Sequence, residues 1–532
     1  MPHHIKRQIL LLQMDPGLDA FGLQQAASKY YWDVVLPVLE RLFDELAGDG
    51  QVIRLDRIEL DLGTMTESSL RGGGMRDELY TLLHAQLQDL LVKQEQGKAV
   101  LFRRETAEAH ALRQWWYYME HGRLQWNQQG ITEDWHSEVL EQFAVDYGEV
   151  SRLRKEMKKG SVVLRRIVAQ HRNPFLETLT GILVAERQAG LAAFIETLLL
   201  LTVWMEERIR GAGSPVRYGD GPKGARRRSL LRRSLTRWEL AHRGFLSLSE
   251  PKRKEAIWEM ILRQAATVGP ALRAGGGVRM LVQWFVGDDQ ILLRWLHDER
   301  SSLPAAVSQL IPPILPRAER PGKKTSKPPR EKSAEGEIPN DERTEPLTMK
   351  ENSVEEIRFT EGDFDEEGIY VTYAGMILLH PFLSTCFSRL QWWVDGEFKD
   401  AECRQKAVFL LHYLATGRKE AEEYELVLPK LLCGYSPETT MPVSVGLAAE
   451  EYEEAEELLK MVLMRWEKLQ GTSPEGLREG FLQRGGKLFR RNDRLTLMVE
   501  SHAIDVLLDY LPWNISLVKL PWLDSLLFVE WR

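Results

Sequence analysis

The sequence predicts an α+β protein that is predominantly α-helical. Apolar residues recur at helical spacing over most of the first 310 residues, short alternating segments indicate strands near both ends, and a charged, proline-rich stretch interrupts the chain. These patterns predict four parts: a strand-helix-strand N-terminal unit (1–65), a helical middle (66–315), a disordered charged linker (316–367), and an α+β C-terminal domain with a Trp-rich anchor (368–532).

Composition narrows the class of protein. With 532 residues, 43% of them apolar and 28% charged, the chain is typical of a globular protein with more than one domain. A net charge of −8 gives no general attraction to nucleic acid or to anionic membranes. The three cysteines form no CxxC pair, which favours free thiols in a reducing compartment. No signal peptide or stretch of about 20 apolar residues is evident, so we expect a cytoplasmic protein without a membrane span.

The N-terminal unit is predicted from two kinds of periodicity. Apolar residues between Leu23 and Leu46 fall at helical spacing, and Pro37 predicts a kink or a break in that helix. QVIRLDRIELDLG (51–63) alternates as a strand, with a slip at Asp56-Arg57 that a bulge would produce. The apolar run Ile9–Leu12 is expected to form an opening strand.

The middle of the chain is a succession of predicted helices without a fixed repeat. A leucine stripe begins it, the segment 111–126 indicates a helix ending near Gly122, and 256–262 and 291–296 continue the pattern. The stripe comprises Leu79, Leu82, Leu83, Leu87, Leu90 and Leu91. Residues 206–237 hold ten Arg or Lys against three acids. Without interleaved aromatic residues, this segment is better interpreted as a solvated face than as a phosphate-binding surface.

A linker and a second folded region follow. Residues 317–352 contain almost no apolar side chains and several prolines, so they cannot offset the entropy of ordering. Beyond them, 446–471 has one apolar face, and Ser473-Pro474 is predicted to begin another helix that Gly485-Gly486 would end. The strand candidates are RLTLMVES (494–501), ISLV (515–518) and LLFVEW (526–531).

A search for chemical motifs yields no catalytic, cofactor-binding or metal-binding residues and no cofactor. Gly219–Gly224 matches GxGxxG literally, but no strand precedes it and Pro222 removes an amide donor. Gly486-Lys487 lacks the following Ser or Thr that would hold magnesium. His380 lies in an apolar run, where a lone histidine is more often a satisfied core residue than a ligand. We therefore expect no enzymatic activity.

Two ends of the sequence resemble the contractile injection system tape measure proteins, which are components of phage-tail-like particles. IRLDRIELDLG (53–63) is similar to the opening signature of that family, and WWYYMEHGRLQW (115–126) to a Trp-rich segment often found after it. The C-terminal matches are YAGMILLHPFL (373–383), KAVFLLHYLATG (406–417), LVLPKLLCG (426–434), LQGTSPEGLREGFLQRGGKL (469–488) and DVLLDYLPWNISLVKLPWLDSLLFVEW (505–531).

The resemblance implies a structural role in assembly, with a middle that varies among family members. Such a protein sits in the lumen of the inner tube, anchored to the baseplate or spike, while tube subunits polymerise around it and reach a set length. The implied partners are inner tube subunits, baseplate or spike components and further copies in the lumen, with no nucleic acid and no membrane. The alternative is a globular assembly factor or chaperone that nucleates the tube or loads cargo without setting length.

The two Leu-Pro-Trp units at Leu511–Trp513 and Leu520–Trp522 are the last unusual feature. Since the implied role has no catalytic residues, we interpret them as packing. Each proline is expected to end a regular element, and each tryptophan to bury a large surface at the corner.

Overall fold

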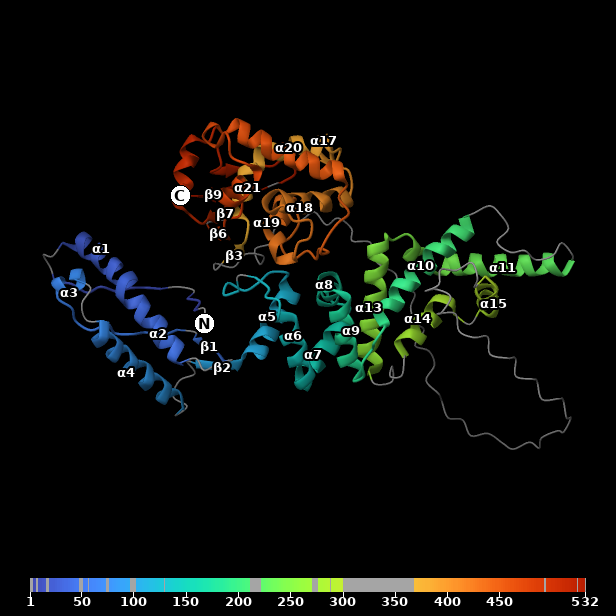
Figure 1. Ribbon diagram of the computed structural model, residues 1–532, viewed down its shortest axis with the longest axis horizontal. Helices are drawn as coiled ribbons and strands as arrows, with labels where there is room; N and C mark the ends of the chain where they lie inside the picture. The colour runs from blue at the N-terminus through green and yellow to red at the C-terminus, as the bar shows by residue number, and fades with distance from the viewer. Residues whose placement is uncertain are drawn as a thin grey trace. The chain divides into compact units, whose positions relative to one another are not determined.

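The computed structural model describes most of the chain, and its fold is mostly helical with one larger sheet (Figure 1). The described residues are 3–5, 8–15, 19–46, 51–55, 57–72, 76–95, 102–128, 130–210, 222–269, 276–287, 289–299, 368–491, 494–523 and 525–531. The predicted class, α+β and predominantly α, is confirmed. None of the helices in these ranges is long and apolar enough to cross a membrane.

The chain divides into two compact units. The first joins Met1–Glu149 with Arg358–Arg532, and the second is Val150–Ile357. The linker predicted over 316–367 lies outside the described residues, and the division into four parts remains a prediction.

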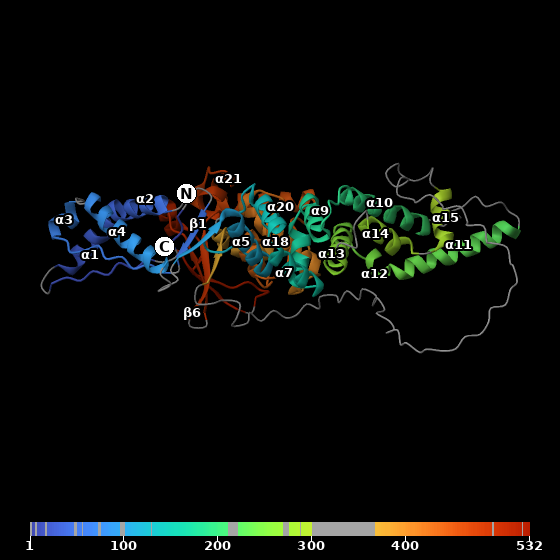
Figure 2. The same ribbon diagram turned by 90° about the horizontal axis from the view of Figure 1, so that it is seen from below.

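The N-terminal part of the first unit is a set of helices packed around a small core. It contains α1 (Ala20–Tyr30), a π-helical turn (Tyr31–Val35), α2 (Leu36–Leu46), α3 (Glu67–Gly72) and α4 (Arg76–Glu95). Helices α2 and α4 lie side by side in both views (Figures 1 and 2). Of the predicted leucine stripe, Leu79, Leu83 and Leu87 are buried in this core.

The irregularity expected at Pro37 takes the form of the π-helical turn that precedes it. A proline has no N–H and its ring displaces the carbonyl four residues earlier, here that of Asp33. The Arg76 Nη2 atom of α4 donates a hydrogen bond of 2.7 Å to that Asp33 oxygen. Because another helix satisfies the displaced carbonyl, the helical run continues through the proline.

The strand predicted over Ile9–Leu12 is wrong. Residues 8–15 have no regular structure, and the four aliphatic side chains are 41–88% exposed. Their β propensity is not used because no neighbouring surface buries one face of the segment. The N-terminal unit is therefore not strand-helix-strand in the predicted sense.

The strand predicted over 51–63 is shorter than expected. It is β1 (Gln51–Leu55), which pairs antiparallel with β2 (Phe102–Thr106), a strand that the sequence did not indicate. Farther along, the Gln86 side chain binds both the backbone N–H and the carbonyl of Asp61, at 2.9 and 2.7 Å. Ile58, Leu60 and Leu62 pack on the helical core. The alternation of apolar and polar residues beyond β1 thus results from burial of one side of the segment against helices.

Two helices complete the N-terminal part of this unit. Helix α5 (Ala107–His121) begins at Thr106, whose hydroxyl accepts from the N–H of Ala109, and ends at Gly122 in the left-handed conformation. This end confirms the predicted stop, since glycine adopts a positive φ at little cost. Helix α6 (Trp135–Val145) packs against α5 through Trp115, Trp116 and Phe143.

The second unit is helical throughout its described residues. Its helices are α7 (Tyr147–Lys158, which starts in the first unit), α8 (Val162–Gln170), α9 (Asn173–Val184), α10 (Leu191–Arg210), α11 (Pro222–Ala241), α12 (Arg243–Leu246), α13 (Glu250–Val268), α14 (Gly276–Val286) and α15 (Gln290–Asp298). The helices predicted at 256–262 and 291–296 are confirmed as parts of α13 and α15.

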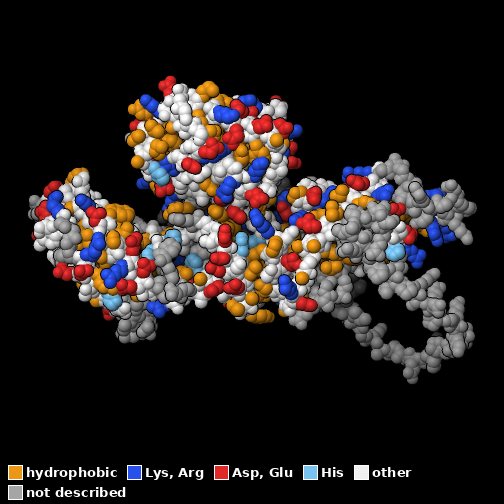
Figure 3. Space-filling view, in the orientation of Figure 1, with side chains coloured by type: hydrophobic (Ala, Val, Ile, Leu, Met, Phe, Trp, Pro, Cys, Tyr) orange, Lys and Arg blue, Asp and Glu red, His pale blue; other side chains and the backbone are white. Residues whose placement is uncertain are grey.

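Helix α11 carries much of the predicted basic segment. Leu231, Leu235 and Trp238 are buried on one face, while Arg226, Arg227, Arg232, Arg233 and Arg237 are exposed. Lys and Arg side chains accordingly show at the surface around α11 (Figure 3). This amphipathic arrangement agrees with the interpretation of the basic segment as a solvated helix face.

The C-terminal part of the first unit is an α+β fold. Its sheet contains β3 (Ile369–Val371), β6 (Gly486–Arg491), β7 (Arg494–Val499), β9 (Leu527–Glu530) and β8 (Leu517–Val518), in the order β3-β6-β7-β9-β8. Only the β7–β9 pair of this sheet is parallel. Strands β4 (Trp393–Val394) and β5 (Glu397–Phe398) form a hairpin. The three predicted strands are confirmed as β7, β8 and β9 with shifted ends.

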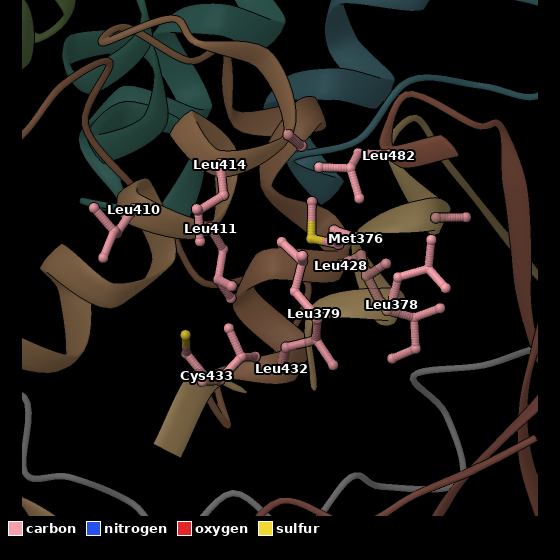
Figure 4. Packing of buried hydrophobic residues seen from close by; sticks show 14 of the residues in the cluster. Met376, Leu378, Leu379, Leu410, Leu411, Leu414, Leu428, Leu432, Cys433 and Leu482 are labelled. Atoms are coloured by element: carbon pink, nitrogen blue, oxygen red, sulfur yellow. The ribbon is translucent and has the colours of Figure 1, made fainter. Parts of the chain in front are cut away.

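Helices cover this sheet and supply most of the core. They are η4 (3₁₀, Ala374–Leu379), α17 (His380–Arg389), α18 (Ala401–Thr416), η5 (3₁₀, Glu423–Leu426), α19 (Val427–Leu432), α20 (Ala449–Arg465), η6 (3₁₀, Glu467–Leu469), α21 (Pro474–Leu477), η7 (π, Arg478–Leu482) and η8 (3₁₀, Ala503–Tyr510). Side chains from η4, α18, α19 and η7 meet in one buried cluster (Figure 4). Ser473 caps α21 as predicted, its Oγ accepting from the N–H of Gly476 at 3.1 Å.

Candidate functional site

The first Leu-Pro-Trp unit fastens the C-terminal segment to η4. The Trp513 indole N–H donates to the carbonyl of Leu378 at 3.1 Å. Its ring meets Phe382 edge to face, with 5.1 Å between ring centroids and an interplanar angle of 83°. Pro512 follows directly after η8 and Leu511, where the missing proline N–H prevents the helix from continuing.

The second Leu-Pro-Trp unit makes an equivalent attachment to α19. The Trp522 indole N–H donates to the carbonyl of Leu432 at 2.6 Å. Its ring lies among Phe387, Trp393 and Phe398, at centroid distances of 5.4, 4.9 and 5.4 Å. These rings come from α17 and the β4–β5 hairpin, so Trp522 joins three elements.

Trp531 makes a third attachment through a buried carboxylate. Its indole N–H donates to Asp505 Oδ2 at 3.2 Å, and Arg484 Nη2 donates to Asp505 Oδ1 at the same distance. Asp505 also accepts from the backbone N–H of His502 at 2.8 Å. The three tryptophans together tie the last segment to the domain core, and the geometry agrees with the packing interpretation.

We expect Trp522→Ala to lower the free energy of unfolding of the C-terminal domain by about 3 kcal/mol. The half-buried ring loses its aromatic neighbours, and the Leu432 carbonyl loses its donor. Trp32→Ala is the matched control, because Trp32 is 61% exposed and its loss should change stability by no more than about 0.5 kcal/mol. Urea unfolding of the full chain measures both, and equal stability of the two variants would contradict the packing role.

His380 has a hydrogen-bond partner, as the sequence favoured, but it is only partly buried and is not a core residue. Its Nε2 atom is 2.9 Å from the carbonyl oxygen of Asn514, which lies between the two Leu-Pro-Trp units. Burial lowers the pKa of this histidine, so the neutral ring that donates to a carbonyl is favoured. The residue thus fixes the C-terminal segment to the start of α17.

The cysteines are free thiols of low reactivity. Cys386 and Cys433 are buried and Cys403 is partly exposed. Burial raises the pKa of Cys386 to about 12, and burial with the nearby Asp400 raises the pKa of Cys403 to about 11. Since the thiolate is the reactive form, none of these groups has the properties of a catalytic nucleophile.

Two rejected motifs can be placed in the fold. Lys487 lies in β6, between β3 and β7, and not in a loop that could surround a phosphate. The first three positions of Gly219–Gly224 lie outside the described residues, and the last three begin α11. Within the described ranges, no group of three or more metal-binding side chains occurs.

A buried charged cluster between α18 and α20 was not predicted. Burial alone would raise the pKa of Glu425, but hydrogen bonds from His412 and Arg418 and the charge of Arg418 outweigh it and hold the pKa at about 2. The Tyr373 hydroxyl also donates to Glu425 Oε1 at 2.8 Å. Close by in sequence, Lys430 Nζ donates to Glu423 Oε1 at 2.8 Å, and both side chains are fully buried. A lysine inside the apolar run LVLPKLL was the signal that could have indicated this pair.

In the C-terminal part of the first unit, Trp513, Trp522 and Trp531 form packing contacts, and Glu423 and Lys430 form a buried ion pair. The whole chain, from residue 2 to residue 531, matches the model of the contractile injection system tape measure protein family. The chain therefore belongs to that family, and its role is structural, in the assembly of contractile injection systems. No curated protein and no solved structure matches it significantly.

Proposed function

We propose that this chain sets the length of the inner tube and sheath of a contractile injection system from within the tube lumen. The observation that carries the proposal is the family match over residues 2–531. The C-terminal domain would serve as the anchor on the baseplate or spike, and the helical middle would supply the measured length. Inner tube subunits and further copies of the chain are the other proposed partners. The proposed location is the cytoplasm during assembly and the particle afterwards.

The dimensions of the chain limit how its middle could measure the length of the tube. An α-helix rises 1.5 Å per residue, so 532 residues in one helix would span roughly 800 Å, whereas a compact chain of this size has a radius of gyration of about 24 Å. Among the described residues of the second unit, the longest helices are α10 and α11, with 20 residues each. A ruler would therefore require the helices of this unit to be arranged in line within the tube.

The packed core of the second unit favours the alternative candidate. Leu153, Leu164, Leu179, Ile195 and Trp258 are no more than 1% exposed and come from five different helices. Opening such a core costs hydrophobic free energy. A globular assembly factor or chaperone that nucleates the tube or loads cargo would keep this core intact.

The location of the chain in finished particles separates the two candidates. A ruler should copurify with particles and resist added protease until the tube is opened, because the tube wall shields it. An assembly factor should be absent from purified particles or be digested at once. Quantitative mass spectrometry of particles, with and without protease, gives the result. A released C-terminal domain of the same chain is the control for protease sensitivity. Complete loss of the chain from intact particles would contradict a position in the lumen.

A further inference from the structure

The segment between α18 and α20 forms a rigid surface built around buried charges. Lys430 Nζ, besides its bond to Glu423, donates to the carbonyl of Pro437 at 3.0 Å. A buried ion pair is tolerated only when further hydrogen bonds satisfy its members. Next to it, Glu425 is fixed by Arg418, His412 and Tyr373. The residues 422–426 are thus held in one conformation by the C-terminal domain itself.

A tyrosine of the Trp-rich helix α5 contacts this surface. Tyr118 is 1% exposed, and its hydroxyl accepts a hydrogen bond of 3.0 Å from the backbone N–H of Glu423. Its ring meets Tyr424 edge to face at 6.1 Å and also contacts Trp135 of α6 at 6.2 Å. The Tyr118–Glu423 contact joins residues 305 positions apart.

Further contacts surround this tyrosine pair. The Tyr424 hydroxyl reaches the turn before α6, where it bonds to the backbone of Ile131 and lies close to Gly130. His121 Nδ1 is 3.2 Å from Glu438 Oε1, and both side chains are substantially exposed. Exposed pairs contribute little, so Tyr118 and Tyr424 are the central contacts.

We propose that the α5–α6 segment (107–145) and the 417–447 segment form a two-part interface that holds the two portions of the first unit together independently of the covalent chain between them. The surface is preformed, so docking does not have to order a loop. On this account the residues between Glu149 and Arg358 are an insertion whose length can change without altering the unit that carries it. The inference deepens the proposed function by making the anchor a two-part structure, but it does not depend on the ruler.

The test uses the full chain with a specific protease site placed within residues 317–352. After cleavage, the two fragments should coelute in gel filtration at low micromolar concentration. Tyr118→Ala should release the C-terminal fragment, because it removes both the ring that contacts Tyr424 and the hydroxyl that accepts from the N–H of Glu423. Tyr118→Phe should weaken the complex about tenfold, since only the hydroxyl is lost.

Tyr147→Ala is the matched control, because Tyr147 belongs to the same unit and is 84% exposed. It should coelute like the unchanged chain. Circular dichroism before cleavage verifies that each variant is folded. If Tyr118→Ala is unfolded, the coelution of the Tyr118→Phe fragments tests the proposal instead. Separation of the unchanged fragments would overturn the proposal, and so would equal retention of the folded Tyr118 variants and the control. Neither result bears on the hypothesis that the chain sets particle length, because the experiment contains no particles.

Discussion

Cells that produce a chain lacking residues 368–532 should yield no injection particles, or particles of uncontrolled length. This deletion removes the sheet and the buried cluster that we propose as the anchor, while the helical middle is retained. Without attachment to the baseplate or spike, a ruler cannot define where tube growth begins. Electron micrographs of particles from these cells give both the number and the length distribution.

A variant of the second unit is the control for that experiment. A deletion of comparable size within residues 150–299 leaves the proposed anchor intact and should still give particles in good number. Particles of normal number and normal length from the chain without 368–532 would contradict the anchor role. Fewer particles of normal length would favour the assembly-factor alternative.

The sequence predicted best those elements whose burial follows a local period. The helix ending at Gly122 was predicted from helical spacing and a glycine at its end, and the helix over Ala449–Arg465 from the apolar face of residues 446–471. The packing role of Trp513 and Trp522 could also be inferred, because a proline ends a regular element and the tryptophan after it can bury a large surface at the corner.

Contacts between distant residues could not be predicted in the same way. The pairing of β1 with β2 joins residues 47 to 55 positions apart, and no local pattern in Phe102–Thr106 marks it. The Ile9–Leu12 prediction failed because an apolar run does not show whether a neighbouring surface exists to bury it. The Tyr118–Glu423 contact requires the tertiary fold, since neither residue is unusual in its own segment.

A ruler and a globular assembly factor differ in one physical quantity, which is the length of tube that each residue of the middle specifies. If the measuring residues form a continuous helix, each contributes 1.5 Å, so the loss of a hundred residues would shorten the particle by about 150 Å. Growth in whole rings of tube subunits would divide this change into steps. In a ruler, the number of residues sets the tube length and their identity does not. Replacing the deleted residues with an equal number of unrelated helical residues should therefore restore the original length.

The most direct test of the central claim is therefore the particle length measured by electron microscopy across a graded series of in-frame deletions between Met75 and Leu310. The account predicts that the mean length falls in proportion to the number of residues removed and returns with the unrelated helical replacement. An unchanged length distribution after the removal of about a hundred residues would contradict it.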